Sequence, residues 1–126
     1  MPKRIAVLDD EPSFLDLLQE VLSDDGYEAH PFPGGEVDYP RVRDLAPDAI
    51  VLDIHMEDPR TGWDLLNRMR RDAVLGATPV IVCSGDLPLL HERAADLERL
   101  GGAVLAKPFD LDDLLTILDR ITDGLA

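Results

Sequence analysis

The chain has 126 residues and is 45% hydrophobic, which is enough for one folded domain with a core of ordinary size. Its 12 Lys and Arg against 26 Asp and Glu give a formal net charge of -14, which argues against duplex nucleic acid as a partner and favours cations or basic protein surfaces. No apolar stretch approaches the ~20 residues of a membrane span and the start of the chain lacks a signal-peptide core, so we expect a cytoplasmic protein with no membrane partner.

The first apolar run, residues 4–8, predicts a short strand that ends in a pair of acids, Asp9 and Asp10. Pro12 suits the first turn of a helix, and the apolar residues within 14–22 recur at helical spacing. Acids at the start of a helix interact favourably with its dipole, which is the simplest explanation of the pair. That explanation does not account for their position directly at the exit of a strand.

Residues 28–32 predict a weaker, more polar strand that suits the edge of a sheet, and Pro40 permits only a short helix at 41–45. The run 49–52 is continuously apolar, which predicts a strand buried on both faces. Asp53 follows this strand directly. Because burial of a lone charge is costly, Asp53 is expected either to reach water at the open edge of the sheet or to face a cation.

A polar loop, residues 54–62, precedes a helix marked by apolar residues within 63–73. Residues 80–83 predict a fourth strand, which contains the single cysteine, Cys83, and is followed by Ser84. One cysteine can form neither an internal disulfide nor a cysteine-rich metal site. We therefore expect an inert thiol in the core.

Asp86 is expected to cap a single helix, and the following residues 103–106 predict a fifth strand that ends at Lys107. Asp110 is expected to cap the last helix. Five strands alternating with five helices predict an α/β fold, with a parallel sheet, helices on both of its faces and right-handed crossovers. No internal repeat or linker divides the chain.

The predicted strand ends share one chemistry. In open parallel sheets ligands bind beyond the carboxyl ends of the strands, and there the sequence places Asp9, Asp10, Asp53, Ser84 and Lys107. Three carboxylates share a small site only when a positive charge holds them, and oxygen ligands without a His or Cys cluster favour Mg²⁺ or Mn²⁺. A lysine and a hydroxyl beside such a metal suit a phosphoryl group, for which an aspartate is a nucleophile.

In these motifs the sequence resembles the receiver domains of two-component response regulators, from residue 5 to about residue 121. The resemblance implies a flavodoxin-like (βα)5 three-layer sandwich with strand order 2-1-3-4-5, and a single receiver domain over residues 1–126. It rests on VLDDEP at 7–12, IVLD at 50–53 with Met56, VCSG at 82–85 and KPF at 107–109.

The resemblance implies a phosphorylation-controlled signalling protein in which Asp53 is the phosphoacceptor. Ser84 and Lys107 would be the catalytic residues, each holding an oxygen of the phosphoryl group. Such a protein is not an enzyme in the usual sense, because it catalyses only its own phosphorylation and its slow autodephosphorylation. It acts by binding a partner or by passing the phosphoryl group onward.

The resemblance also implies a metal site for Mg²⁺ or Mn²⁺. Asp10 and Asp53 would bind the ion directly, Asp9 would bind it through water, and His55 would contribute its backbone carbonyl. A histidine side chain as an additional metal ligand is an alternative at that position, although no second histidine accompanies it.

The partner implied by the resemblance is a histidine kinase or histidine phosphotransfer protein, which would dock near Ser13, Leu17 and Phe109. An output protein is also implied, but the sequence does not identify it. Nucleic acid is not expected as a partner, and we expect a monomer or weak dimer.

Some features depart from the usual pattern of this family. Glu57 follows Met56 where proline is usual, and the loop that these residues occupy is one residue longer. Val104 stands where an aromatic residue is common, so we expect phosphorylation to be relayed through a shift of the helix after the fourth strand instead of a ring movement. The resemblance further implies a cis peptide bond between Lys107 and Pro108.

Two other functions fit parts of the pattern. A pseudo-receiver that binds a partner constitutively is one, although the complete set of acids, serine and lysine argues against it. The other is a hydrolase with an aspartyl-phosphate intermediate, similar to the haloacid-dehalogenase-like phosphatases. Asp9 and Glu11 have the two-residue spacing that such enzymes use, but no segment for a cap or a substrate pocket is recognisable.

Overall fold

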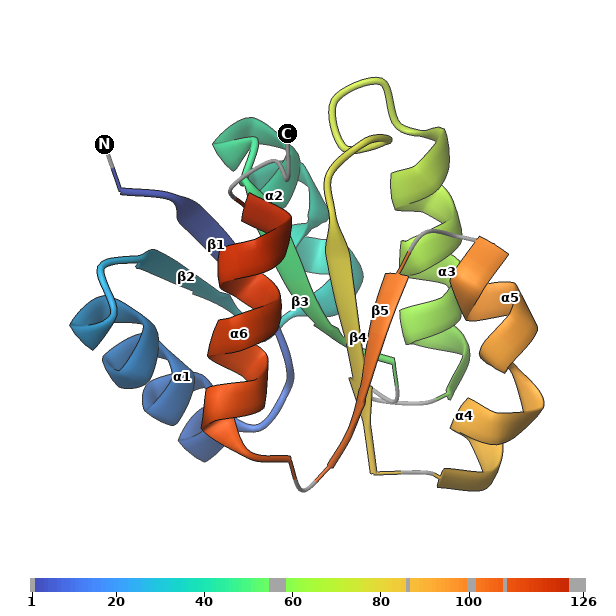
Figure 1. Ribbon diagram of the computed structural model, residues 1–126. Coiled ribbons are helices and arrows are strands. Elements are labelled where there is room, and N and C mark those ends of the chain that lie inside the picture. Colours follow the sequence, from blue (N-terminus) through green and yellow to red (C-terminus); the bar gives the residue numbers. More distant parts are fainter. Residues whose placement is uncertain (1, 55–58, 86, 100–101, 108, 123–126) are drawn as a thin grey trace.

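The computed structural model describes residues 2–54, 59–85, 87–99, 102–107 and 109–122. Within these residues, five parallel strands form one sheet in the order β2-β1-β3-β4-β5, as predicted (Figure 1). The central strands are buried along nearly their whole length because helices cover both faces of the sheet, which explains their continuous apolar runs. The strands are β1 (Arg4–Leu8), β2 (Glu28–Phe32), β3 (Ala49–Asp53), β4 (Val80–Ser84) and β5 (Gly102–Ala106).

The helices form the two outer layers of a flavodoxin-like sandwich (Figure 1). One face of the sheet is covered by α1 (Pro12–Asp24) and α6 (Leu111–Thr122). The other is covered by α2 (Tyr39–Leu45), which follows a short 3₁₀ helix, η1 (Gly35–Asp38), and by α3 (Pro59–Arg71). Two short helices, α4 (Leu87–Glu92) and α5 (Ala94–Arg99), lie next to β5.

Two hydrophobic clusters, one on each face of the sheet, hold these layers together. Leu18 of α1 and Leu118 of α6 are fully buried in the first cluster, and Leu66 of α3 is fully buried in the second. Successive residues of a strand point to opposite faces, so Ile5 belongs to the first cluster and Ala6 to the second. Because successive residues of one apolar run point to opposite faces, a single strand contributes side chains to both hydrophobic clusters.

The helix predicted after β4 differs from the observed structure. It is divided at Arg93 into α4 and α5, so the described residues contain six α-helices where five were predicted. At this turn the guanidinium of Arg93 lies 5.2 Å from the ring centre of Trp63 and forms an ion pair of 3.5 Å with Asp96. The spacing of apolar residues is the same on both sides of the turn, so periodicity alone did not locate the break.

Two helix starts also differ from the prediction. Helix α2 begins at Tyr39, because Pro40 fits the first turn of a helix, where its missing N–H is not needed. Helix α3 begins at Pro59 for the same reason, within the stretch predicted as a loop. The cap at Asp110 is confirmed: its carboxylate accepts a hydrogen bond of 3.0 Å from the N–H of Asp112.

Several predictions concern residues outside the described ones. These are the cap at Asp86, the cis bond to Pro108, the carbonyl ligand at His55 and the departure at Glu57. Among the described helices, none is long and apolar enough to cross a membrane.

Candidate functional site

The residues predicted at the strand ends lie at one edge of the sheet, the lower edge in Figure 1. Asp9 and Asp10 follow β1, Asp53 is the last residue of β3, Ser84 is the last residue of β4, and Lys107 follows β5. Strand β3 lies between β1 and β4, which places Asp53 at the centre of this edge. The parallel register therefore brings together residues that are up to 98 positions apart in the chain.

Three carboxylates form a compact group at this edge. Each of Asp9, Asp10 and Asp53 offers one oxygen, and these oxygens lie within 4.8 Å of one another. Asp9 is only 1% exposed, and its Oδ1 accepts a hydrogen bond of 2.9 Å from the N–H of Glu11. The donor set is made of oxygens alone, and opposite ligands of octahedral Mg²⁺ are about 4.2 Å apart. The group therefore fits a hard divalent cation after small side-chain adjustments.

The ammonium of Lys107 lies against this group. Its Nζ donates to Oδ2 of Asp9 at 2.7 Å and lies 3.4 Å from Oδ2 of Asp53. Burial alone lowers the pKa of Lys107, but the hydrogen bond that its ammonium donates to Asp9 and the charges of both carboxylates outweigh that effect, so the pKa lies above its usual value. Lys107 is therefore a permanent cation that offsets part of the negative charge of the acids.

Strand β4 ends in a buried serine whose backbone is hydrogen-bonded to that of Lys107. Ser84 is fully buried, and its carbonyl accepts a hydrogen bond of 2.7 Å from the N–H of Lys107, which ties the ends of β4 and β5 together. The preceding residue, Cys83, is fully buried as predicted, and burial raises the pKa of its thiol to about 12. A thiol with that pKa is protonated and inert near neutral pH.

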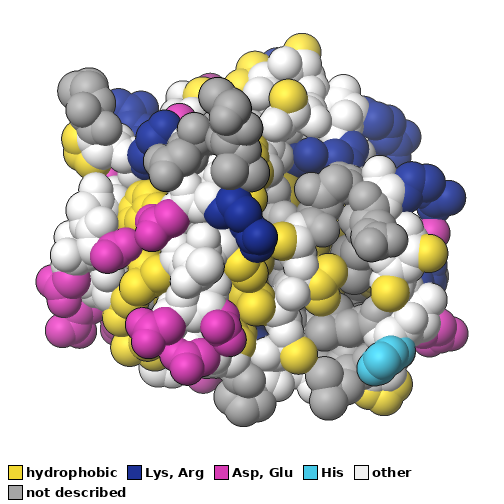
Figure 2. Space-filling model, in the orientation of Figure 1, with side chains coloured by type: hydrophobic (Ala, Val, Ile, Leu, Met, Phe, Trp, Pro, Cys, Tyr) yellow, Lys and Arg dark blue, Asp and Glu magenta, His cyan; other side chains and the backbone are white. Residues whose placement is uncertain are grey.

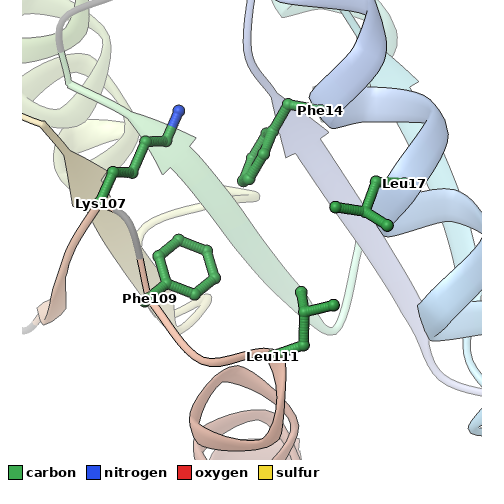
Figure 3. A pocket seen from close by; sticks show the side chains of 5 residues that line it. All are labelled: Phe14, Leu17, Lys107, Phe109 and Leu111. Carbon is green, nitrogen blue, oxygen red and sulfur yellow. The ribbon is translucent and has the colours of Figure 1, made fainter.

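Two aromatic side chains lie beside Lys107: Phe109, which was predicted to contact the donor, and Phe14, which was not predicted at the site. Phe14 of α1 and Phe109 pack edge to face, with ring centres 6.0 Å apart and an angle of 89° between the rings (Figure 3). Phe14 belongs to the apolar stripe predicted for the helix at residues 14–22, and nothing in the sequence distinguishes it from the other residues of that stripe. A cavity of about 460 Å³ opens beside these rings, lined by Phe14, Leu17, Lys107, Phe109 and Leu111.

Glu11, the acid that the hydrolase alternative would pair with Asp9, lies outside the group of three carboxylates. Glu11 is exposed, and its Oε1 accepts a hydrogen bond of 3.1 Å from the hydroxyl of Ser13. The carboxylate group that gathers among the described residues consists of Asp9, Asp10 and Asp53 and does not include Glu11. The geometry thus gives no support to a reaction that pairs Asp9 with Glu11.

Comparison with known families agrees with this geometry. The sequence matches the family model described as the response regulator receiver domain over residues 5–119, which is nearly the whole chain. The chain belongs to this family. It is therefore a receiver domain of the two-component response regulators. Receiver domains are signalling modules that interact with histidine kinases and are not enzymes of the ordinary kind.

Individual relatives of this receiver domain include larger regulators. It is 32% identical over 119 residues to the transcriptional regulatory protein TcrA of Mycobacterium tuberculosis, covering 94% of this chain and 46% of TcrA. It is 29% identical over 126 residues to the nitrogen assimilation regulatory protein NtrX of Azorhizobium caulinodans, covering 99% of this chain and 27% of NtrX. The receiver chain thus spans less than half the length of these two relatives.

Solved structures confirm the fold of the receiver. The chemotaxis protein CheY4 of Vibrio cholerae superposes with a TM-score of 0.84 at 23% identity, and the match covers 96% of this chain and 99% of CheY4. At that level of identity the likeness establishes the arrangement of strands and helices.

Proposed function

We propose that this receiver accepts a phosphoryl group on Asp53 from a phosphohistidine of a histidine kinase or phosphotransfer protein. The observation that carries the proposal is the position of the Asp53 carboxylate, at the centre of the sheet edge, with two further carboxylates on one side and the ammonium of Lys107 at 3.4 Å. A nucleophilic oxygen, a cation and a group of oxygen ligands for a metal are the components that phosphoryl transfer requires.

A divalent cation, Mg²⁺ or Mn²⁺, would be held by Asp10 and Asp53 directly and by Asp9 through water. The support for this is the purely oxygen donor set with its separations within 4.8 Å. When bound, the ion neutralises negative charge on the transferring phosphoryl group. It also offsets the repulsion among the three carboxylates, which Lys107 alone offsets only in part.

In the transfer step an oxygen of Asp53 attacks phosphorus, and the bond from phosphorus to the donor breaks. With a phosphohistidine donor the electron pair of the P–N bond stays on the imidazole, which then takes a proton from water. Lys107 pairs with one phosphoryl oxygen, and the hydroxyl of Ser84 donates to another. Later attack of water on phosphorus would return the Asp53 carboxylate and release inorganic phosphate.

The donor would dock over the apolar cavity beside Lys107. Leu17 is 44% exposed at this cavity, so an apolar side chain is accessible there to a partner. Figure 2 shows acidic side chains gathered around α1 and the adjoining end of α6, with hydrophobic side chains between them. An apolar centre with an acidic surround suits a donor that presents an apolar patch with a basic surround.

The test of the proposed function is labelling with acetyl phosphate in the presence of Mg²⁺. Wild type is expected to gain one phosphoryl group by mass spectrometry, and Asp53→Asn is expected to gain none, because an amide is not a nucleophile for phosphorus. Asp44→Asn, at an exposed position of α2, is the matched control and is expected to behave as wild type. Labelling of Asp53→Asn at the wild-type level would show that another residue is the phosphoacceptor. No labelling of wild type would leave constitutive partner binding as the better function.

Asp10 gives a separate prediction about the metal. Asp10→Asn is expected to raise the free energy of unfolding of the metal-free protein by about 1 kcal/mol, because one of three crowded charges is removed. The same change is expected to weaken Mg²⁺ binding by about tenfold or more. Calorimetry with Asp16→Asn as a control at an exposed position of α1 measures both effects. Equal Mg²⁺ affinity in wild type and Asp10→Asn would remove the metal assignment.

A further inference from the structure

Lys107 has a third neighbour besides its two carboxylates. Its Nζ lies 4.1 Å from the centre of the Phe14 ring, well inside the ~6 Å over which a ring face attracts a cation. Figure 3 shows the lysine extending from the end of β5 toward the ring, which descends from α1. The ammonium is therefore held between Asp9, Asp53 and an aromatic face.

The ring is itself supported. Phe109 packs edge to face against Phe14, and Phe14 packs against the cluster that contains the fully buried Leu18. Two covalently distant parts of the chain, the start of α1 and the segment after β5, thus meet across the lysine. A ring fixed on two sides can define the position of the ammonium better than a mobile exposed side chain could.

The contact with the ring differs from those with the acids in one respect that matters for the proposed function. A carboxylate neutralises the ammonium, and a divalent cation bound among the three carboxylates would repel it. A ring face attracts the ammonium through its quadrupole without neutralising it and does not compete for the metal. Phe14 can therefore keep Lys107 in place while its charge remains available to a phosphoryl oxygen.

We propose that Phe14 is a positioning residue for Lys107, whose ammonium its ring face holds beside the acidic group in the place where the phosphoryl group arrives. This inference rests on the proposed function, because the role of Lys107 depends on phosphoryl transfer to Asp53. It assigns to Phe14 an electrostatic task in addition to its packing in the cavity wall.

Two substitutions separate that task from packing. Phe14→Leu keeps an apolar side chain against the cluster but removes the ring face, whereas Phe14→Tyr retains the ring. The labelling rate with acetyl phosphate is expected to fall about fivefold in Phe14→Leu, the equivalent of ~1 kcal/mol, and to stay at the wild-type rate in Phe14→Tyr. Leu115→Ala is the matched control and is expected to be labelled at the wild-type rate: it removes apolar packing from the same hydrophobic cluster, at a residue of α6 that does not line the cavity beside Lys107.

A second measurement follows the contact itself and does not depend on phosphorylation. In NMR spectra the Cε protons of Lys107 are expected to be shifted upfield by the Phe14 ring in wild type and Phe14→Tyr, and this shift is expected to disappear in Phe14→Leu. An unchanged lysine signal in Phe14→Leu, or an unchanged labelling rate, overturns the role of Phe14. Failure of wild type to be labelled at all overturns the proposed function instead, and the NMR shift then reports only a resting contact.

Discussion

Gly62→Ala is expected to lower the free energy of unfolding by about 3 kcal/mol or more. Gly62 lies in the first turns of α3, and a Cβ at this position would overlap the carbonyl group of Ile54. Ile54 cannot retreat easily, because it is fully buried and its N–H donates to the carbonyl of Cys83 at 3.0 Å. Any displacement of Ile54 would also move Asp53, the residue before it.

Two physical effects oppose each other in this substitution. Helix propensity alone would make alanine more stable than glycine by about 1 kcal/mol, whereas the overlap with backbone atoms cannot be relieved by a side-chain rotation. We expect the overlap to dominate. Urea denaturation measures the outcome, and Gly85→Ala is the control, since the nearest atom to a Cβ there is Cβ of Lys107 at 4.0 Å. A Gly62→Ala protein as stable as wild type would show that the segment before α3 can move away.

The fold could be predicted largely because the strands are almost entirely apolar and are separated by helical stretches. Residues 49–52 illustrate this, since a continuous apolar run can only be a strand buried on both faces or part of a buried helix, and its length favours the strand. The break at Arg93 could not be predicted, because the apolar residues keep the same spacing across it and the contact of Arg93 with Trp63 involves another helix. Local periodicity contains no information about such contacts.

The same distinction applies to the candidate site. Asp53 and Lys107 could be predicted because parallel strands bring their carboxyl ends to one edge, so position in the chain determines position in space. The direct ion pair of Lys107 with Asp9, and the ring of Phe14 beside it, could not be derived in this way. They depend on how far α1 and the segment after β5 approach each other, which packing decides.

The exposed position of Val104 bears on how a signal could leave the site. Its side chain lies on β5 and is 40% exposed, in the place where the family commonly has an aromatic residue. A valine has a single side-chain torsion and cannot fill the space that a movement of Ser84 would vacate. We therefore expect any relay in this protein to pass through a shift of the helix that follows Ser84 and β4 instead of through a ring movement.

Removal of the Lys107 charge is the second change from which we expect a large effect on stability. The Lys107 ammonium lies within hydrogen-bonding distance of both Asp9 and Asp53, and Asp9 is almost fully buried. Removing one partner of a buried ion pair is strongly destabilising, because the remaining charge is left without compensation. Here three crowded carboxylates would remain.

Lys107→Met, which keeps most of the aliphatic side chain but removes the charge, is accordingly expected to lower the free energy of unfolding by about 3 kcal/mol in metal-free buffer. Mg²⁺ is expected to stabilise this variant more than it stabilises wild type, because the ion takes over the compensation of the carboxylates without having to overcome the repulsion of the ammonium. Urea denaturation with and without Mg²⁺ measures both effects.

Lys3→Met is the control. Lys3 also donates a hydrogen bond of 2.7 Å, but it does so from an exposed position and to the neutral carbonyl of Thr122. The loss of this hydrogen bond is expected to lower the free energy of unfolding by no more than about 1 kcal/mol. A Lys107→Met protein that is as stable as wild type without metal would contradict the stabilising role of the ion pairs of Lys107. A smaller gain from Mg²⁺ than in wild type would contradict the placement of the metal among the three carboxylates.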